Sequence, residues 1–375
     1  MGTTPQRSLS LRRTASVARK ELLHLLRDRS TLFFALFIPV LELFMLGYAI
    51  DTNVRHIRTA VFDQARTQES RQLLRMFETS EDFDVVEEVY READLHEAIV
   101  DGRARVGIMI PEDYSRKLQA GQTAQLLVLV DGSVSSVAAE AVNVGNALAL
   151  RESLRVVLGD KALPVESRPQ VLFNPDTRSA NFFIPGLLVV MCQLLATQLT
   201  ANAIVREKVN GTLEQLFMTP VRAGELVLGK CAPYLVLTFL EMCGIVGLMV
   251  VVFQVPIHGT FLTLMAIALP FILTMLGWGL WISTKAETTD AAGQMVMGTV
   301  MPSIFLSGYV FPVDSMPWLF QQVALAIPTT WLIDAARGVI LRGAGWRELW
   351  VHALVLWGMA AFMLTVSTLR FQKKL

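Results

Sequence analysis

The fold is decided by one charged stretch, Val205-Arg206-Glu207-Lys208-Val209-Asn210-Gly211-Thr212-Leu213-Glu214-Gln215-Leu216-Phe217-Met218-Thr219-Pro220. It lies between two apolar runs, Phe182–Ile204 and Cys231–Phe253, and each run is long enough to cross a bilayer, which takes about 20 helical residues. A polar hairpin that joins two spans on one face of a bilayer is a natural docking surface for a soluble partner. The stretch therefore predicts a membrane protein with such a hairpin.

The composition of the whole chain agrees with a membrane protein rather than a soluble enzyme. Its 375 residues are 53% hydrophobic and 18% charged, whereas soluble chains carry about 25% charged residues. The formal net charge is zero, so a broad basic surface for nucleic acid has no support. Three cysteines, Cys192, Cys231 and Cys243, lie in or beside apolar runs, and their spacing supports neither a disulfide framework nor a metal site.

We predict an α-helical polytopic membrane protein with six transmembrane helices, a re-entrant external hairpin and an inserted external α/β domain. Residues 1–30 form an amphipathic helix, 31–51 the first span as an uncleaved anchor, 52–178 the α/β domain, and 179–375 five further spans. The polar hairpin takes residues 205–230 and the re-entrant segment residues 312–348, where Pro and Gly break two short helices. The predicted spans are Thr31–Ile50, Phe182–Ile204, Cys231–Phe253, Phe261–Ser283, Ala291–Phe311 and Leu349–Leu369.

The N-terminal segment has the pattern of an interfacial helix. Apolar residues recur at helical spacings and basic residues fill the other faces, which favours a helix lying on the membrane surface over a poorly ordered tail. Lys and Arg concentrate in this segment, in the polar hairpin and at the C-terminus, so both termini are expected in the cytoplasm. The predicted stripe is Leu11, Ala15, Ala18, Leu22 and Leu25.

The α/β domain is predicted from alternating strand and helix patterns. No catalytic or metal-ligand spacing occurs in it, so we interpret it as an interaction or gating module. The strands are expected at Thr59–Phe62, Phe83–Tyr90, Val106–Ile110 and Leu126–Val130, and the helices at Glu69–Phe77, Glu92–Val100, Glu112–Ala120 and Val134–Leu158.

Two carboxylates fall inside predicted spans. Glu42 and Glu241 each carry a cost of about 3 kcal/mol on insertion scales, so they should face a bundle interior or water. Either could line a path for a cationic substrate, carry a proton, or form a structural hydrogen bond between helices. Met297 would suit a permissive apolar path, although methionines also fill cores. Asp334 and Arg337, three residues apart, predict a local ion pair.

The polar hairpin contains the signals of a short helix. Thr212 and Gln215 match a capping box, and Pro220 stops the helix. An apolar face exposed to the cytosol favours docking to a partner over packing against neighbouring helix ends. A run from Gly224 to Lys230 imitates a phosphate-binding loop, but Cys231 stands where Ser or Thr is required and a membrane span follows. We therefore expect no ATP site in this chain, and no enzyme activity of its own.

These motifs together resemble those of type-2 ABC export permeases, the ABC-2 family, over the whole chain. The matching residues are Arg206-Glu207-Lys208, Gly211-Thr212-Leu213-Glu214, Thr219-Pro220, Glu225-Leu226, Gly229-Lys230, Leu306-Ser307-Gly308-Tyr309-Val310-Phe311-Pro312, Met316-Pro317, Pro328-Thr329-Thr330, Arg337 and Leu341-Arg342-Gly343-Ala344-Gly345. Only Lys208-Val209-Asn210 departs mildly from the pattern. The inserted domain places the chain near bacterial multidrug-efflux-like permeases.

The resemblance implies a role for each of these motifs. The hairpin would be a coupling helix that docks on an ATPase, residues 10–29 an elbow helix at the membrane surface, and the re-entrant segment an external gate. Glu42, Glu241 and Met297 would lie along the translocation path. The ATPase-coupling residues would be Arg206, Glu207, Gly211, Thr212, Leu213, Glu214, Leu216, Phe217, Thr219 and Pro220, and the gate residues Ser307, Gly308, Phe311, Pro312 and Pro328.

The function implied is that of the permease subunit of an ATP-binding-cassette exporter in a bacterial inner membrane. It would move an amphipathic, drug-like or lipid-like molecule outward. ATP-Mg would bind a separate cytoplasmic ATPase, and this chain would hold no cofactor. Other expected partners are a second copy or close paralogue, lipid, and a periplasmic membrane-fusion adaptor, but not nucleic acid. The alternatives are a proton-coupled secondary transporter, and a membrane sensor or scaffold that uses the external domain.

Overall fold

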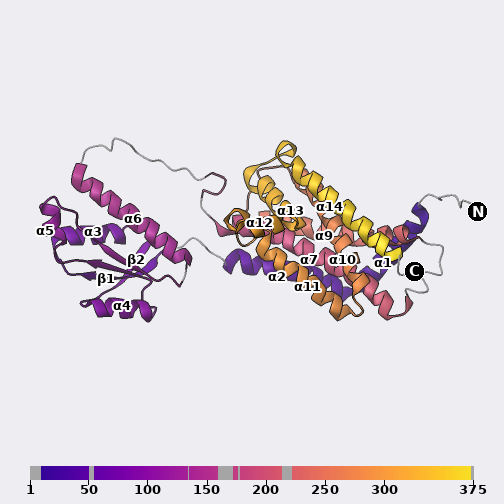
Figure 1. Ribbon diagram of the computed structural model, residues 1–375, viewed down its shortest axis with the longest axis horizontal. Helices are drawn as coiled ribbons and strands as arrows, with labels where there is room; N and C mark the ends of the chain where they lie inside the picture. Colours follow the sequence, from indigo (N-terminus) through magenta and orange to yellow (C-terminus); the bar gives the residue numbers. More distant parts are fainter. Residues whose placement is uncertain are drawn as a thin grey trace, which may run out of the picture. The chain divides into compact units, whose positions relative to one another are not determined.

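The computed structural model describes residues 10–49, 55–133, 135–158, 172–175, 178–212 and 222–372. The chain forms two compact units, of which one comprises Met1–Ile50 with Val171–Leu375 and the other Asp51–Gln170. The first unit is helical, and the second is an α/β unit (Figure 1).

The α/β unit is built on a four-stranded sheet with the strand order β2-β1-β3-β4. β1 pairs in parallel with both β2 and β3, whereas β4 runs antiparallel to β3. The strands lie where alternating apolar residues predicted them. Their bounds are Ile57–Asp63 (β1), Phe83–Glu88 (β2), Val106–Ile110 (β3) and Leu127–Val130 (β4).

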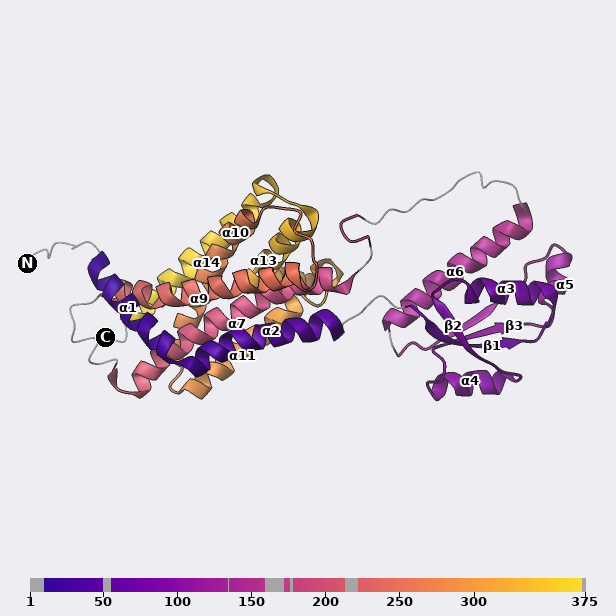
Figure 2. The ribbon, with the colours of Figure 1, turned by 180° about the vertical axis from the view of Figure 1, so that it is seen from behind.

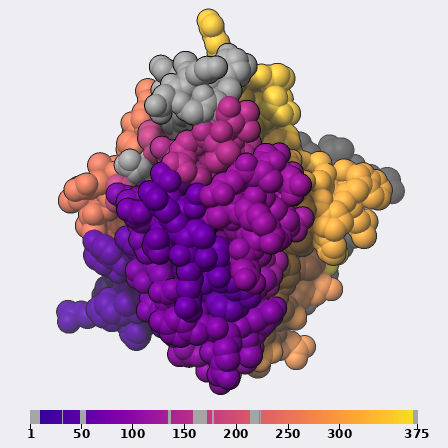
Figure 3. All heavy atoms as spheres, turned by 90° about the vertical axis from the view of Figure 1, so that its left-hand side faces the viewer, coloured from indigo at the N-terminus to yellow at the C-terminus, as the bar shows by residue number. Residues whose placement is uncertain are grey.

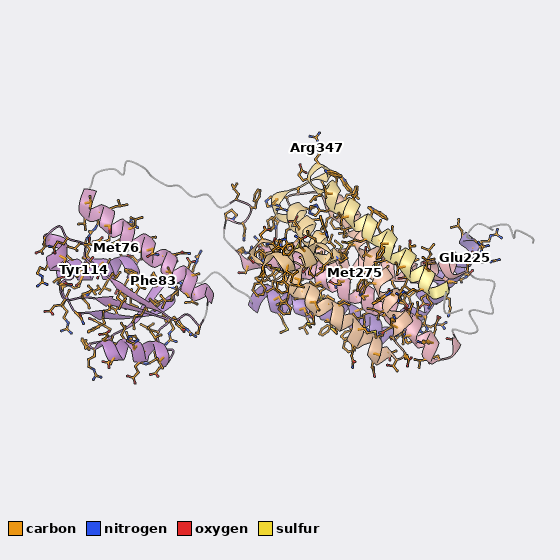
Figure 4. The ribbon with its side chains drawn as sticks, in the orientation of Figure 1. Met76, Phe83, Tyr114, Glu225, Met275 and Arg347 are labelled. Carbon is orange, nitrogen blue, oxygen red and sulfur yellow. The ribbon has the colours of Figure 1, made fainter. Side chains whose placement is uncertain are left out.

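Helices cover both faces of this sheet (Figure 1). Leu73, Phe77 and Tyr114 pack with one face in a core that includes Phe83, while Leu95 of α4 packs on the opposite face. The surface of this unit faces the viewer in Figure 3, and Phe83 and Tyr114 are labelled in Figure 4. The helices are α3 (Gln68–Glu78), α4 (Glu92–Val100), α5 (Tyr114–Gln119) and α6 (Ser135–Leu158), close to the predicted bounds.

The helical unit is organised around α7, which runs through its centre and packs against α2, α9, α10, α11 and α13 (Figure 2). About two thirds of the side chains along α7 are buried, and they point to all sides of the helix, as its mostly apolar sequence indicates. The helices are α1 (Leu11–Arg27), α2 (Arg29–Ala49), α7 (Ser179–Val209), α9 (Ala223–Val251), α10 (Phe261–Lys285), α11 (Thr289–Leu306), α12 (Trp318–Leu325), α13 (Pro328–Arg337) and α14 (Trp346–Gln372), with a short 3-10 turn at Val313–Ser315 and a π-helical turn at Gly338–Arg342.

Close backbone contacts hold α10 in place between α7 and α14. A Cβ atom on Gly279 would lie 2.5 Å from the carbonyl oxygen of Thr197, so only glycine allows α10 to approach α7 this closely. On the other side, the hydroxyl of Ser367 donates a hydrogen bond of 2.7 Å to the carbonyl oxygen of Gly277. Met275, labelled in Figure 4, is buried in the same helix.

Four helices in the described part of the chain are long and apolar enough to cross a membrane, namely α7, α9, α10 and α14. Two bent pairs would raise the number to six: α1 with α2 at 67°, and α12 with α13 and the π-helical turn at 88°. Helix α11, which covers most of the predicted span Ala291–Phe311, is not among these four helices. It begins at Thr289, ends at Leu306 and carries polar residues in its first turns. The number of spans stays a prediction, while the two short helices expected after residue 312 are present.

Candidate coupling site

The base of the predicted coupling hairpin lies at the end of α7. The backbone of Gly211 has a φ of +69°, a left-handed conformation that favours glycine after a helix end. The hydroxyl of Thr212 donates a hydrogen bond of 3.3 Å to the carbonyl oxygen of Glu207. The remaining predicted coupling residues, Leu213, Glu214, Leu216, Phe217, Thr219 and Pro220, lie outside the described residues, as does Gln215 of the capping box.

A buried group of charged side chains joins this hairpin base to α1 and α9. Lys230 of α9 places its Nζ atom 2.9 Å from Oε2 of Glu207 as an ion pair, and 3.3 Å from Oε2 of Glu21. The hydroxyl of Tyr234 donates a 2.6 Å hydrogen bond to Glu21, and Lys20 donates one of 2.8 Å to Glu207. We call these five residues the ionic cluster.

The ionic cluster is electrically balanced, because two carboxylates face two ammonium groups. Lys230 is 1% exposed and Glu21 is 3% exposed. Charges this far from water are stable only when they are paired, and removing one partner of a buried pair is strongly destabilising. The cluster therefore fixes the position of α1 against the ends of α7 and α9.

The residues on either side of Glu207 reach two further elements. Nη1 of Arg206 lies 3.1 Å from Oδ2 of Asp28, in the link between α1 and α2. Nζ of Lys208 donates a hydrogen bond of 3.0 Å to the carbonyl oxygen of Ala286, in the turn that follows α10. Three consecutive hairpin residues are thus attached to three different parts of the helical unit.

The beginning of α1 is attached to α9 by a second buried carboxylate. Glu225, labelled in Figure 4, accepts hydrogen bonds from the backbone N–H groups of Ser10 at 2.7 Å and Arg222 at 3.0 Å. One turn further along α9, a Cβ atom on Gly229 would lie 2.7 Å from Cβ of Val17. The two helices are therefore in direct contact along this face.

The buried face of α1 is offset from the predicted apolar stripe. Val17, Glu21 and Leu25 turn inward, whereas Leu11 is 86% exposed and Leu22 is 41% exposed. Glu21 was not predicted as a site residue, because it is a single acidic residue in a segment that is otherwise rich in basic residues. Its spacing of four residues from both Val17 and Leu25 is the signal that could have identified it.

Arg337 contacts one predicted gate residue, Gly308. Its guanidinium donates hydrogen bonds to the carbonyl oxygens of Gly308 (2.8 Å), Tyr309 (3.2 Å) and Phe182 (3.3 Å), and it lies 3.7 Å from the centre of the Phe182 ring. Ser307 is buried at the end of α11. Arg337 therefore joins the start of α7 to the loop after α11.

The other gate residues differ in exposure and position. Phe311 is 56% exposed, Pro312 precedes the 3-10 turn, and Pro328 is the first residue of α13. A buried polar contact lies nearby, where Gln193 accepts hydrogen bonds from the hydroxyls of Ser303 and Thr329. The structure thus brings Gly308 into contact with Arg337, buries Ser307 and leaves Phe311 exposed.

The predicted ion pair between Asp334 and Arg337 is wrong. The carboxylate of Asp334 lies 3.0 Å from Nη2 of Arg342 and 2.8 Å from Nε2 of His352. A spacing of three residues brings two side chains to one face of a helix, but here the backbone carbonyls around residue 308 take the Arg337 guanidinium instead.

The three predicted path residues are not brought together. Glu241 is 2% exposed and lines a cavity between α2, α7 and α9. Glu42 is partly exposed on α2 and is not part of the cavity lining. Met297 is 43% exposed on α11.

Lys230, the residue that imitated a phosphate-binding lysine, lies within helix α9 and is fully occupied by the ionic cluster. Its ammonium group is paired with Glu21 and Glu207 rather than free to bind a phosphate.

Known proteins with similar sequences are membrane transport subunits. The chain is 28% identical to the probable multidrug ABC transporter permease YbhS of Escherichia coli over 98% of both chains. It is 26% identical to the probable multidrug ABC transporter permease YbhR of the same organism, over 89% of this chain and 92% of YbhR. The inner membrane transport permease YhhJ of E. coli is 26% identical over 97% of this chain and 98% of its own length. The family model for ABC-2 family transporter proteins matches residues 29–369, and the chain belongs to this family.

Proposed function

We propose that this chain is the membrane-spanning permease subunit of an ATP-binding-cassette exporter. It would move an amphipathic small molecule, drug-like or lipid-like, out of the cytoplasm or the inner leaflet. A separate cytoplasmic ATPase binds and hydrolyses ATP-Mg, and a second permease copy or close paralogue completes the path. The relatives that are named multidrug ABC transporter permeases support the assignment of this chain as a permease of such a transporter.

The attachment of the hairpin base to α1, α9, the start of α2 and the turn after α10 carries the proposal. In this scheme the ATPase displaces the hairpin, and a displacement is useful only if it reaches the helices that line the path. Glu207 transmits it to α1 and α9 through the ionic cluster, Arg206 to the start of α2, and Lys208 to the turn after α10. Because the central ion pairs are buried, these helix ends move with the hairpin rather than sliding past it.

The remaining parts have roles that follow from this arrangement. In this proposal both termini and the hairpin would lie in the cytoplasm, and the α/β unit would be external, where it would contact its twin or an adaptor. The loop held by Arg337 would close the external exit until the helices move.

The test is co-purification of the full-length protein with its ATPase, followed by measurement of ATP hydrolysis and export. Phe217→Asp should release the ATPase and abolish export, because it places a charge on the apolar docking face. Val100→Asp, at an 85% exposed position of the α/β unit, is the matched control and should retain both activities.

Retention of the ATPase and of export by Phe217→Asp would contradict the assignment of the hairpin. Export that needs no ATPase and follows a pH gradient would instead support a proton-coupled transporter.

A further inference from the structure

A cavity of about 390 Å³ opens between α2, α7 and α9. Most of its walls are apolar, and Ser30, Gln198, Asn202 and Glu241 are the polar residues of the lining. Its size falls in the range of about 300–1,000 Å³ that is typical of small-molecule sites. The wall residues that α2 contributes include Phe34 and Ile38, which are 55% and 39% exposed, so the cavity has an open side along this helix. Its apolar lining is completed by Ala35, Pro39, Met191, Leu194, Leu195 and Leu199.

One carboxylate, that of Glu241, is part of the cavity lining. Glu241 is 2% exposed, and neither of its carboxylate oxygens has a hydrogen-bond partner among the residues that the structure describes. The side-chain oxygen of Asn202, which also lines the cavity, is buried and unpaired within the same described set. A carboxylate in apolar surroundings is costly unless a cation or hydrogen-bond donors compensate it.

These groups define the chemistry of a ligand that would fit. It needs an apolar body to occupy the walls, and a positive group to lie against the carboxylate. The ring of Phe34 adds a face that attracts cations. An anionic ligand would face Glu241 without any cationic side chain in the lining to offset it.

We propose that this cavity is the entry site of the exporter and that Glu241 binds the cationic group of an amphipathic substrate. This inference rests on the proposed export function and narrows its substrate class to lipophilic cations. The cavity lies in the part of α7 that leads to the hairpin, with Asn202 about one turn before Arg206. A lipophilic cation in the inner leaflet would therefore enter along α2, close to the elements that the ATPase moves.

A structural role for Glu241 fits the geometry less well. A hydrogen bond between helices would need a partner, and the described residues provide none to either oxygen. Asp290, in the first turn of α11, is exposed and outside the cavity lining, so it provides a control for charge removal.

The test is equilibrium binding of tetraphenylphosphonium, a permanent lipophilic cation, to the purified full-length protein. Tetraphenylborate has the same shape and the opposite charge, and should not compete. Glu241→Gln should weaken phosphonium binding by at least about tenfold. The attraction within an ion pair at an effective dielectric constant of about 20 changes a dissociation constant by more than this factor. Glu241→Asp should retain most of the affinity, and Asp290→Asn should leave it unchanged.

A second variant tests the cavity without altering the charge. Ala35→Phe fills the apolar space while Glu241 stays in place, and it should also abolish binding. Gel filtration identifies any variant that has not folded.

Several results would overturn the proposal: no saturable binding by the wild type, equal affinity in Glu241→Gln, an equal loss in Asp290→Asn, or equal binding of tetraphenylborate. Failure of the proposed function can be distinguished from failure of the cation site. If Phe217→Asp releases an ATPase but Glu241→Gln binds the phosphonium normally, only the cation site is wrong. If binding depends on Glu241 but no ATPase drives export, the cation site remains and the exporter assignment is wrong.

Discussion

Replacing Lys230 by Met tests whether the ionic cluster holds α1 in place. The ammonium group of Lys230 is 1% exposed and lies between the carboxylates of Glu21 and Glu207. Met preserves most of the length of the side chain and removes the charge. The two carboxylates then remain close to each other with only the contacts of Tyr234 and Lys20 to compensate them.

The expected cost is about 3 kcal/mol, at the lower end of the range for breaking a buried ion pair, because each carboxylate keeps one partner. If this free energy is lost from the docking of α1, the population of molecules with α1 detached rises about 100-fold. Adding Glu21→Gln should recover part of the loss, since the double variant leaves no orphaned charge on α1.

Amide hydrogen exchange along α1 measures this population directly, and ATPase-driven export measures its consequence. Lys20→Met is the matched control. It removes the same charge from a side chain that is 57% exposed, where an ion pair contributes less than about 1 kcal/mol. Equal protection of α1 in Lys230→Met and the wild type would refute the role of the cluster, and so would equal effects of the two variants.

Two further predictions concern other contacts. Gly229→Leu should detach α1 and reduce export, because even a Cβ atom at this position would lie 2.7 Å from Val17. Gly244→Leu is the control and should leave α1 attached, because a Cβ atom there meets open space. Protease cleavage of α1 distinguishes the two variants. Hydrogen bonds from Ser133 lower the pKa of Asp131 to about 2, so the stability it contributes is present above about pH 4 and is lost toward pH 2. The urea-unfolding midpoints of Asp131→Asn and wild type should therefore converge on acidification, and a constant difference would contradict this.

The α/β unit could be predicted closely because its signals are local. Strand alternation and turn residues placed β1, β3 and β4 within two residues of their observed bounds. The apolar runs of α7, α9 and α10 were equally clear, since each helix is long enough to cross the hydrocarbon core and has a high mean hydropathy. Local patterns did not reveal that α11 ends at Leu306, where the chain turns away through Gly308 with a φ of +85°.

The candidate site was only partly predictable because its contacts join residues far apart in the sequence. The motif around Glu207 was identified, but its partners Glu21 and Lys230 came from other helices, and Lys230 was considered only as a false phosphate-binding lysine. Arg337 was assigned to a neighbour on its own helix, whereas its actual partners are carbonyl groups of the α11–α12 loop and of α7. Patterns of spacing identify which face a side chain occupies, and they do not identify what lies opposite.

The ionic cluster and the apolar cavity share the same two helices. On α7, Asn202 and Glu207 are separated by about 8 Å along the axis, and on α9, Lys230 and Glu241 by about 16 Å. A rigid shift of the end of α7 relative to α9 would therefore change the cavity walls directly, without a relay through other residues. If both proposals hold, bound cation and bound ATPase must influence each other, because linkage between two sites is reciprocal. Tetraphenylphosphonium should then alter the affinity of the permease for its ATPase in the wild type, and this effect should disappear in Lys230→Met, where the hairpin base is no longer tied to α9.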